Sequence, residues 1–322
     1  MTVPVGICST AHVHADAYLE VLEDLGAAEV VGLAADDHRA EELGRAHEVP
    51  VRPQEAILED AEAVVVASTN ADRSRWIEPA AAAGVAVLAE KPLATTTARA
   101  EQLVATCAEA GVTLAVAMPL RHCRPAERAR KLLLDGAIGD LEAVSGTNRG
   151  LLPGGWFQDP DAAGGGAVMD HTVHIVDLVC WWTGERVEEV YAETATYFHD
   201  GPLEDVNYLS MTLSDGTIVS LDGSWSRPEG WRFWGDATVE LVGTDGTMDV
   251  DCFGDVLTLT RSGAGGESVH YGRDPNRRLL EQFLATVAGG GGHIATGREA
   301  VDAVAVVEAA YESADRGEPV TV

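Results

Sequence analysis

Lysine is almost absent from this chain of 322 residues: only Lys91 and Lys131 occur, and arginine supplies the other basic side chains. The 22 basic residues are outnumbered by 52 acidic ones, for a net charge of -30. Nucleic-acid binding needs clustered Lys and Arg, so the composition argues against a nucleic-acid partner. A strongly acidic surface repels itself in dilute buffer and is better tolerated where salt screens it. Two interpretations stay open, a salt-rich cytoplasm with an acidic proteome and an ordinary acidic protein.

Long apolar runs and paired cysteines are missing as well. No stretch approaches the ~18 consecutive apolar residues of a membrane span. Residues 1–10 lack the basic segment and apolar run of a signal peptide, so we expect a cytoplasmic protein. The five cysteines are scattered, odd in number and without CxxC spacing, which predicts free thiols and neither a metal site nor a disulfide framework.

The length exceeds the usual size of one hydrophobic core and predicts two domains. Over residues 1–120, short apolar runs alternate with helix-like stretches, and the run at 63–67 is continuously apolar. This rhythm predicts an α/β domain, a Rossmann-type doubly wound parallel sheet. Its expected strands are 4–8, 30–34, 63–67, 85–89 and 113–117, and its expected helices are 15–25, 39–47 and 97–110.

The pattern changes over residues 121–322, for which we predict an α+β domain with a large open, mostly antiparallel sheet. We expect a helix at 125–135, a strand at 141–147, an irregular loop at 150–166 and a helix from Gly166 to Thr183 closed by Gly184. Successive strands should fill 187–271, and two late helices should cover 278–288 and 298–315.

The loop after the first strand is the expected place for a dinucleotide pyrophosphate, where G-x-G-x-x-G is usual. This chain has Ser9-Thr10-Ala11-His12-Val13-His14 instead. Small residues still open a helix N-terminus, which favours an anion, and the hydroxyls add donors. On this loop alone, a plain βα turn with Ser/Thr capping is the favoured interpretation.

Asp36 and Asp37 follow the second strand, the usual place of the carboxylate that binds the adenosine ribose. A carboxylate there repels a 2′-phosphate and favours NAD over NADP, whereas Arg39 nearby leaves NADP open. An ordinary Asp-Asp turn is the simpler alternative.

Lys91 follows the fourth strand in Glu90-Lys91-Pro92. A lysine at the carboxyl end of a parallel strand lies where such sheets bind ligands. Because lysine is so rare in this chain, we favour a functional role for Lys91 over that of an ordinary solvent-exposed charge.

The predicted helix at 166–183 carries Asp170, His174 and Asp177 on one stripe with Trp181. Its other side is apolar, so these titratable groups need a polar cavity or mutual pairing. An Asp four residues before a His can orient the imidazole as a general base. A half-exposed helix with a solvated ion pair fits the pattern as well, and Asp170, His171 and His174 lack a further ligand that would indicate a metal.

The order of these motifs resembles the Gfo/Idh/MocA oxidoreductases, which include glucose-fructose oxidoreductase and inositol dehydrogenases. The resemblance covers essentially the whole chain. It is carried by Glu90-Lys91-Pro92, by residues 164–177 (GGGAVMDHTVHIVD), by 281–283 and by 308–314. The resemblance implies an NAD(P)-dependent dehydrogenase or reductase acting on the CH–OH group of a sugar, polyol or related polyhydroxylated compound.

The resemblance also implies roles for named residues. Lys91, Asp170 and His174 would be catalytic, and no metal would be required. The cofactor would be bound by Ser9, Thr10, Ala11, His12, Asp36, Asp37, Ser68, Thr69, Asn70, Glu90, Lys91 and Pro92. The substrate would be bound by Arg121, His122, Trp156, His171, Asp170 and His174. An open antiparallel sheet further suggests a homo-dimer or homo-tetramer formed through that sheet.

Two departures from the family keep other functions open. The glycine-poor loop at 9–14 fits a ligand sensor or regulatory protein that keeps the fold without catalysis, and residues 70–73 lack the family's proline and histidine. The same residues also suit a lyase-like or epimerase-like enzyme that recycles bound NAD. Retention of Lys91, Asp170 and His174 together argues against a sensor.

Overall fold

The structure is a computed structural model that describes residues 2–35, 38–231, 234–261 and 265–322. By its internal contacts the chain divides into two compact units. Unit 1 comprises residues 1–119, 161–164 and 275–304, and unit 2 comprises 120–160, 165–274 and 305–322. We had expected a division into 1–120 and 121–322. The segments at 161–164 and 275–304 belong to unit 1 because α9 (Pro275–Val287) packs on α1 and β14 (Ala295–Thr296) pairs with β5.

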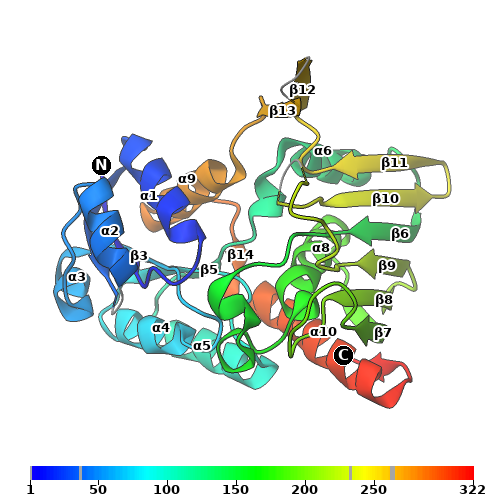
Figure 1. The fold of residues 1–322 in the computed structure, drawn as a ribbon, viewed down its shortest axis with the longest axis horizontal. Coiled ribbons are helices and arrows are strands. Elements are labelled where there is room, and N and C mark those ends of the chain that lie inside the picture. The colour runs from blue at the N-terminus through cyan, green and yellow to red at the C-terminus, as the bar shows by residue number, and fades with distance from the viewer. Residues whose placement is uncertain (1, 36–37, 232–233, 262–264) are drawn as a thin grey trace. The chain divides into compact units, whose positions relative to one another are not determined.

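Unit 1 is built on a six-stranded sheet in the order β14-β5-β4-β3-β1-β2 (Figure 1). Its five parallel strands are β1 (Val3–Cys8), β2 (Ala28–Ala34), β3 (Ala63–Val66), β4 (Ala86–Ala89) and β5 (Leu114–Val116). Its helices before α9 are α1 (His14–Asp24), α2 (His38–Ala46), α3 (Gln54–Asp60), α4 (Arg73–Ala82) and α5 (Thr97–Glu109). The doubly wound parallel sheet is therefore confirmed.

Both faces of this sheet are covered, which is why its strands are apolar throughout. On one face Val5 and Ile7 pack with Tyr18 and Leu19 of α1 and with Phe283 of α9. On the other face, a Cβ on Gly6 would lie 2.2 Å from Ile57 of α3, so this position requires glycine. The strands are thus packed against apolar side chains on both faces.

Unit 2 contains a seven-stranded sheet in the order β11-β10-β6-β9-β8-β7-β15 (Figure 1). Its strands are β6 (Leu141–Thr147), β7 (Val187–Ala195), β8 (Val206–Leu213), β9 (Ile218–Asp222), β10 (Thr238–Gly243), β11 (Gly246–Asp251) and β15 (Val320–Thr321). The sheet is mostly antiparallel as predicted, but β6 and β9 pair in parallel. A separate antiparallel pair, β12 (Val256–Arg261) with β13 (Gly265–His270), lies outside this sheet.

The helices of unit 2 are α6 (Arg124–Leu134), α8 (Ala167–Thr183) and the last part of α10 (Gly297–Arg316). The first part of α10 and most of α7 (Pro160–Ala163) belong to unit 1. Short 3-10 turns lie at Pro119–His122 and Gly155–Gln158. The expected irregular loop at 150–166 therefore contains α7 and one of these turns. Gly184 ends α8 with a φ of +80°, as predicted.

Two general expectations concern the whole chain. All five cysteines are free thiols, as predicted. Within the described part of the chain, none of the helices is both long and apolar enough to cross a membrane.

Candidate active site

The carboxyl ends of β1, β3 and β4 meet at one edge of the parallel sheet. Cys8 lies opposite Val66, and Val66 lies opposite Ala89, so the segments that follow these strands begin side by side. These segments hold the predicted cofactor-binding residues of unit 1 other than Asp36 and Asp37. Most of them are buried, with exposed fractions of 6% or less: Ser9, Thr10, His12, Ser68, Asn70, Glu90 and Lys91.

The loop after β1 is held by bonds to both neighbouring strands and to α2. The N–H of Ser9 donates to the carbonyl of Ala34 at 2.6 Å, and the N–H of His12 donates to the carbonyl of Ala67 at 2.8 Å. Ser9 has a φ of +67°, the left-handed region in which glycine is usual. The guanidinium of Arg39 donates to three carbonyls of this loop.

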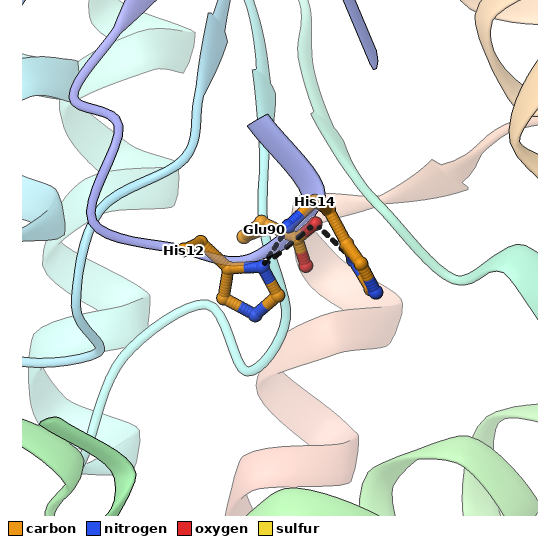
Figure 2. A group of neighbouring side chains, drawn as sticks. All are labelled: His12, His14 and Glu90. Carbon is orange, nitrogen blue, oxygen red and sulfur yellow. Dashed lines mark hydrogen bonds and ion pairs between the residues drawn. The ribbon is translucent and has the colours of Figure 1, made fainter. Parts of the chain in front are cut away.

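Glu90 joins this loop to the end of β4 (Figure 2). Its Oε1 lies 2.8 Å from Nδ1 of His14, 3.6 Å from Nδ1 of His12, and accepts the hydroxyl of Tyr18 at 2.6 Å. Since a carboxylate only accepts, Nδ1 of His14 carries the shared hydrogen. Nδ1 of His12 accepts the N–H of His14 at 3.2 Å. Sequence reasoning placed His12 and Glu90 at the cofactor, but it did not predict that His14 bonds to both of them or that Tyr18 bonds to Glu90.

The pKa values in this cluster follow from its burial. Burial lowers the pKa of His12 to about 3, which leaves a neutral imidazole whose Nδ1 is free to accept the N–H of His14. Burial alone raises the pKa of Glu90, but the two histidines and the hydrogen bonds from His14 and Tyr18 outweigh it and hold the pKa well below its ordinary value. Glu90 is therefore a buried carboxylate stabilised by donors.

His12, His14 and Glu90 also form a group of possible metal ligands, with one atom of each within 4.8 Å of the others. Two contacts favour a hydrogen-bonded network instead. The lone pair of His12 Nδ1 accepts the N–H of His14, and a separation of 2.8 Å between His14 and Glu90 is a hydrogen-bond length. Ligands around one zinc ion stand farther apart, at roughly 3.3 Å for metal–ligand distances near 2.0 Å. The arrangement is suited to fixing the loop against the end of β4.

Lys91 lies in a loop that is held by a buried arginine that our sequence analysis did not select. The peptide between Lys91 and Pro92 is cis. Arg73, 1% exposed, donates to the carbonyl of Pro92 at 2.5 Å, to that of Lys91 at 2.8 Å and to that of Ser68 at 3.1 Å. It also donates to Oδ1 of Asn70 at 2.8 Å. Burial lowers the pKa of Arg73 to about 10, so the guanidinium remains charged at neutral pH while it joins the ends of β3 and β4.

In unit 2, α8 carries the predicted stripe. Asp170, His174 and Asp177 are all buried, with 6%, 6% and 3% exposed. Oδ2 of Asp170 accepts the indole N–H of Trp225 at 3.1 Å and lies 3.2 Å from Nε2 of His171. Trp225 is 1% exposed, and its indole N–H holds this carboxylate in place.

The third titratable group of the stripe is paired. Asp177 accepts two hydrogen bonds from Arg121, at 2.7 Å from Nε and 2.6 Å from Nη2. The same guanidinium lies 5.6 Å from the centroid of the Trp181 ring. The mutual pairing expected for a titratable group on a buried helix is found at this pair. The predicted contact of Arg121 with substrate stays a prediction.

The other predicted substrate residues of unit 2 are His122, His171 and Trp156, and the contacts described for each are different. His122 is buried, and Nδ1 of His171 donates to the carbonyl of Gly223 at 2.8 Å. Trp156 stacks on Phe157, with ring centroids 3.9 Å apart.

The N-terminus of α8 has a side-chain cap that our sequence analysis did not predict. The carboxylate of Glu204 accepts the N–H groups of Gly166 and Val168 at 3.1 Å and 3.0 Å. The hydroxyl of Tyr311 donates to Glu204 at 2.8 Å and accepts the N–H groups of Gly166 and Met169. This pair fixes the start of the helix one turn before Asp170.

Two parts of the predicted site keep their status as predictions. Asp36 and Asp37 lie outside the described residues. Lys91 belongs to unit 1 and the α8 stripe to unit 2, and because each unit is described by itself, the pairing of Lys91 with Asp170 and His174 stays a prediction.

Comparison with known proteins identifies both parts of the chain. Residues 3–118 match the family model described as "Oxidoreductase family, NAD-binding Rossmann fold", and residues 126–249 match "GFO/IDH/MocA C-terminal domain". The chain is 27% identical to D-apiose dehydrogenase of Paraburkholderia graminis, over 98% of this chain and 87% of that protein. It is 29% identical to D-xylose 1-dehydrogenase (NADP(+)) 2 of Haloferax volcanii, over 82% of each. Its structure resembles that of GenD2 from gentamicin A biosynthesis, solved in complex with NAD, with a TM-score of 0.91, 28% identity, and coverage of 100% of this chain and 96% of that chain.

Proposed function

Because this chain belongs to the Gfo/Idh/MocA family of oxidoreductases, with its NAD-binding Rossmann domain, we propose that it transfers hydride between a nicotinamide cofactor and a CH–OH group of a sugar, polyol or related compound. One observation supports this proposal most strongly. The loop after β1, the Ser68–Asn70 segment and the Glu90–Pro92 segment meet at one sheet edge and are joined there by buried Glu90 and Arg73.

The residues present fit a dinucleotide. The carboxyl ends of parallel strands are where such sheets bind nucleotides, and here they carry buried hydroxyl, amide and ammonium groups instead of apolar side chains. Ser9, Thr10, Ala11 and His12 would hold the pyrophosphate, Asp36 and Asp37 the ribose, and Ser68 to Asn70 with Glu90 to Pro92 the nicotinamide half. We favour NAD, since two carboxylates after β2 disfavour a 2′-phosphate.

The catalytic roles follow from what each side chain can do. When bound, the nicotinamide accepts or returns the hydride. Alcohol oxidation also releases the hydroxyl proton, and we assign His174 as the base that takes it. Lys91 supplies a positive charge for the developing alkoxide. Asp170 is oriented by Trp225 and His171, which suits it to accept a hydrogen bond from a neighbouring substrate hydroxyl.

The substrate class is inferred from the relatives' names, which denote apiose, xylose and inositol dehydrogenases. Arg121, His122, Trp156 and His171 are our candidates for further substrate contacts. We also propose a cytoplasmic homo-dimer or homo-tetramer formed through the sheet of unit 2, with neither a nucleic-acid partner nor a required metal.

A second reaction class is favoured by a specific observation. One relative, 28% identical over 60% of this chain and 52% of that protein, is named 2,7-anhydro-N-acetylneuraminate hydratase. Hydration involves no net oxidation, so an enzyme of this family that recycles bound NAD is the alternative.

The test is turnover in high salt after bound nucleotide has been released. Sugars and polyols are screened for absorbance at the NADH band, with wild type, Lys91→Ala and His174→Ala in parallel. We expect wild type to reduce NAD and both variants to lose at least ~100-fold in kcat. Product formed without net NADH would support the recycling enzyme, whereas wild type that binds no nucleotide and shows no turnover would support the sensor and overturn the proposal.

A further inference from the structure

Arg39 lies in the first turn of α2, and its guanidinium contacts the glycine-poor loop that follows β1. Nη1 donates to the carbonyl of Thr10 at 2.7 Å and to that of His12 at 2.9 Å, and Nη2 donates to that of Val13 at 3.2 Å. Three of the five N–H groups of one side chain therefore bind three backbone carbonyls within four residues.

These bonds set the direction of the loop's amides. In a trans peptide the C=O and the following N–H point in opposite directions. With the carbonyls of Thr10 and His12 directed at Arg39, the N–H groups of Ala11 and Val13 point away from the guanidinium, and that of Ala11 donates to the hydroxyl oxygen of Ser9 at 3.3 Å. Backbone N–H groups that point away from Arg39 beside the Ser9 hydroxyl are donors of the kind that an anion requires.

The usual fingerprint reaches that geometry with glycines, which adopt it at low cost. Here the backbone of Ser9 is in the left-handed region, and no glycine follows until Gly26. The loop conformation therefore needs hydrogen bonds from side chains outside the loop. Planar, charged and forked, a guanidinium can bind several carbonyls at once, whereas an ammonium is a single point charge.

We propose that Arg39 is a positioning residue for the cofactor, a clasp that keeps the glycine-poor loop in its pyrophosphate-binding shape and does not serve as a receptor for a 2′-phosphate. This inference rests on the proposed nicotinamide-dependent function. It also predicts how Arg39 affects the choice between NAD and NADP. Loss of the clasp weakens NAD and NADP equally, because both carry the same pyrophosphate.

The experiment compares Arg39→Met, which keeps the stem but removes the charge and the donors, with Arg39→Lys, which keeps the charge but removes the fork. Arg45→Met is the matched control, an exposed arginine on the same helix whose loss changes the net charge by the same amount. The readouts are Kd for NADH and for NADPH by fluorescence, KM for NAD against kcat, and hydrogen–deuterium exchange of residues 9–14 without nucleotide.

We expect Arg39→Met and Arg39→Lys each to raise both Kd values by on the order of tenfold, the effect of losing about one net charge-assisted hydrogen bond. KM should rise while kcat at saturating NAD changes little, and exchange at 9–14 should accelerate. Arg45→Met should match wild type in every readout.

Three results overturn the proposal. Selective loss of NADPH binding would identify a 2′-phosphate receptor, wild-type affinity in Arg39→Lys would show that charge alone matters, and unchanged exchange in both Arg39 variants would exclude a clasp. If wild type binds no nucleotide, the exchange measurement still decides whether the clasp exists, and only the proposed function fails.

Discussion

His12 is a fully buried imidazole with a specific protonation state. Its pKa is lowered by burial to about 3, and Nδ1 accepts a backbone N–H. In the unfolded chain the same group has an ordinary pKa of 6.5. Between these values the unfolded state binds a proton that the native state does not, so the stability contributed by His12 is present above pH 6.5 and is lost as the pH falls toward 3.

This difference predicts the effect of His12→Asn, in which the amide oxygen can replace Nδ1 as the acceptor. Between pH 7.5 and pH 5, wild type should lose about 2 kcal/mol more free energy of unfolding than the variant, from 1.5 pH units at 1.36 kcal/mol each. Urea unfolding at the two pH values measures it.

His47→Asn is the control of opposite sign. Although partial burial lowers the pKa of His47, hydrogen bonds to Asp16 and Glu23 outweigh this and raise it, so its contribution is present at low pH and is lost as the pH rises. Parallel pH slopes for wild type and His12→Asn would contradict the neutral, buried state of His12.

At the scale of residues, the sequence indicated which side chains could carry chemistry but not what holds them. Lys91, Asp170 and His174 were selected as candidates because rarity, strand-end placement and helical spacing are local signals. Arg73, Tyr18 and Trp225 were missed as partners because each reaches its target across a separation in sequence that no local pattern encodes.

Helix α8 depends on a side-chain cap at its first turn. Glu204 and Tyr311 come from far later in the chain and satisfy the N–H groups that a helix start leaves unpaired. Burial raises the pKa of Glu204, even though the Tyr311 hydroxyl and the amides of α8 act against the shift.

Tyr311→Phe should therefore destabilise the protein by about 1–3 kcal/mol, because the amides of Gly166 and Met169 lose an acceptor and Glu204 loses a donor. Chemical denaturation measures the change. The matched control is Tyr191→Phe, which removes a tyrosine hydroxyl that hydrogen-bonds to exposed Glu193 and should change stability by less than about 0.5 kcal/mol. Equal effects of the two substitutions would show that the cap adds nothing to α8.

At the scale of elements, strand and helix positions were predicted well where apolar periodicity was strong, as in β1, β3 and α8. Three helices assigned to unit 1 were not singled out: α3 has only seven residues, α4 contains Pro79, which interrupts the usual helix signal, and α7 has only four residues. The parallel pairing of β6 with β9 was also not predictable, since strand order is set by long-range packing and not by the pattern within a strand.

For the molecule as a whole, the net charge of -30 sets how stability depends on salt. Like charges repel more strongly in the compact state than in the expanded chain, and added ions screen them. Thermal unfolding should accordingly shift to higher temperature as KCl increases.

Screening predicts the shape of this increase. The Debye length falls from about 30 Å at 0.01 M to about 8 Å at 0.15 M, so most of the gain in melting temperature should come below ~0.2 M KCl. Sucrose of equal osmolality, which does not screen charge, is the control. A melting temperature that is flat in KCl would contradict a role for surface repulsion.

The division into two units shows where the sequence was least informative. A strand-rich stretch followed by helices suggested one continuous second domain, but α9 packs on α1 and β14 pairs antiparallel with β5 of unit 1. The apolar face of α9 does not indicate which core will bury it.

The scarcity of lysine has a practical consequence once its two positions are compared. Lys131 is exposed near the end of α6 and pairs with Asp135, whereas Lys91 is 5% exposed at the end of β4. Any reagent that modifies side-chain amines, whether an acylating enzyme or a laboratory label, can react only at these two lysines, and one of them is at the proposed catalytic centre. A Lys131→Arg variant would turn an ordinary amine-reactive dye into a probe of Lys91 and the N-terminal amine alone.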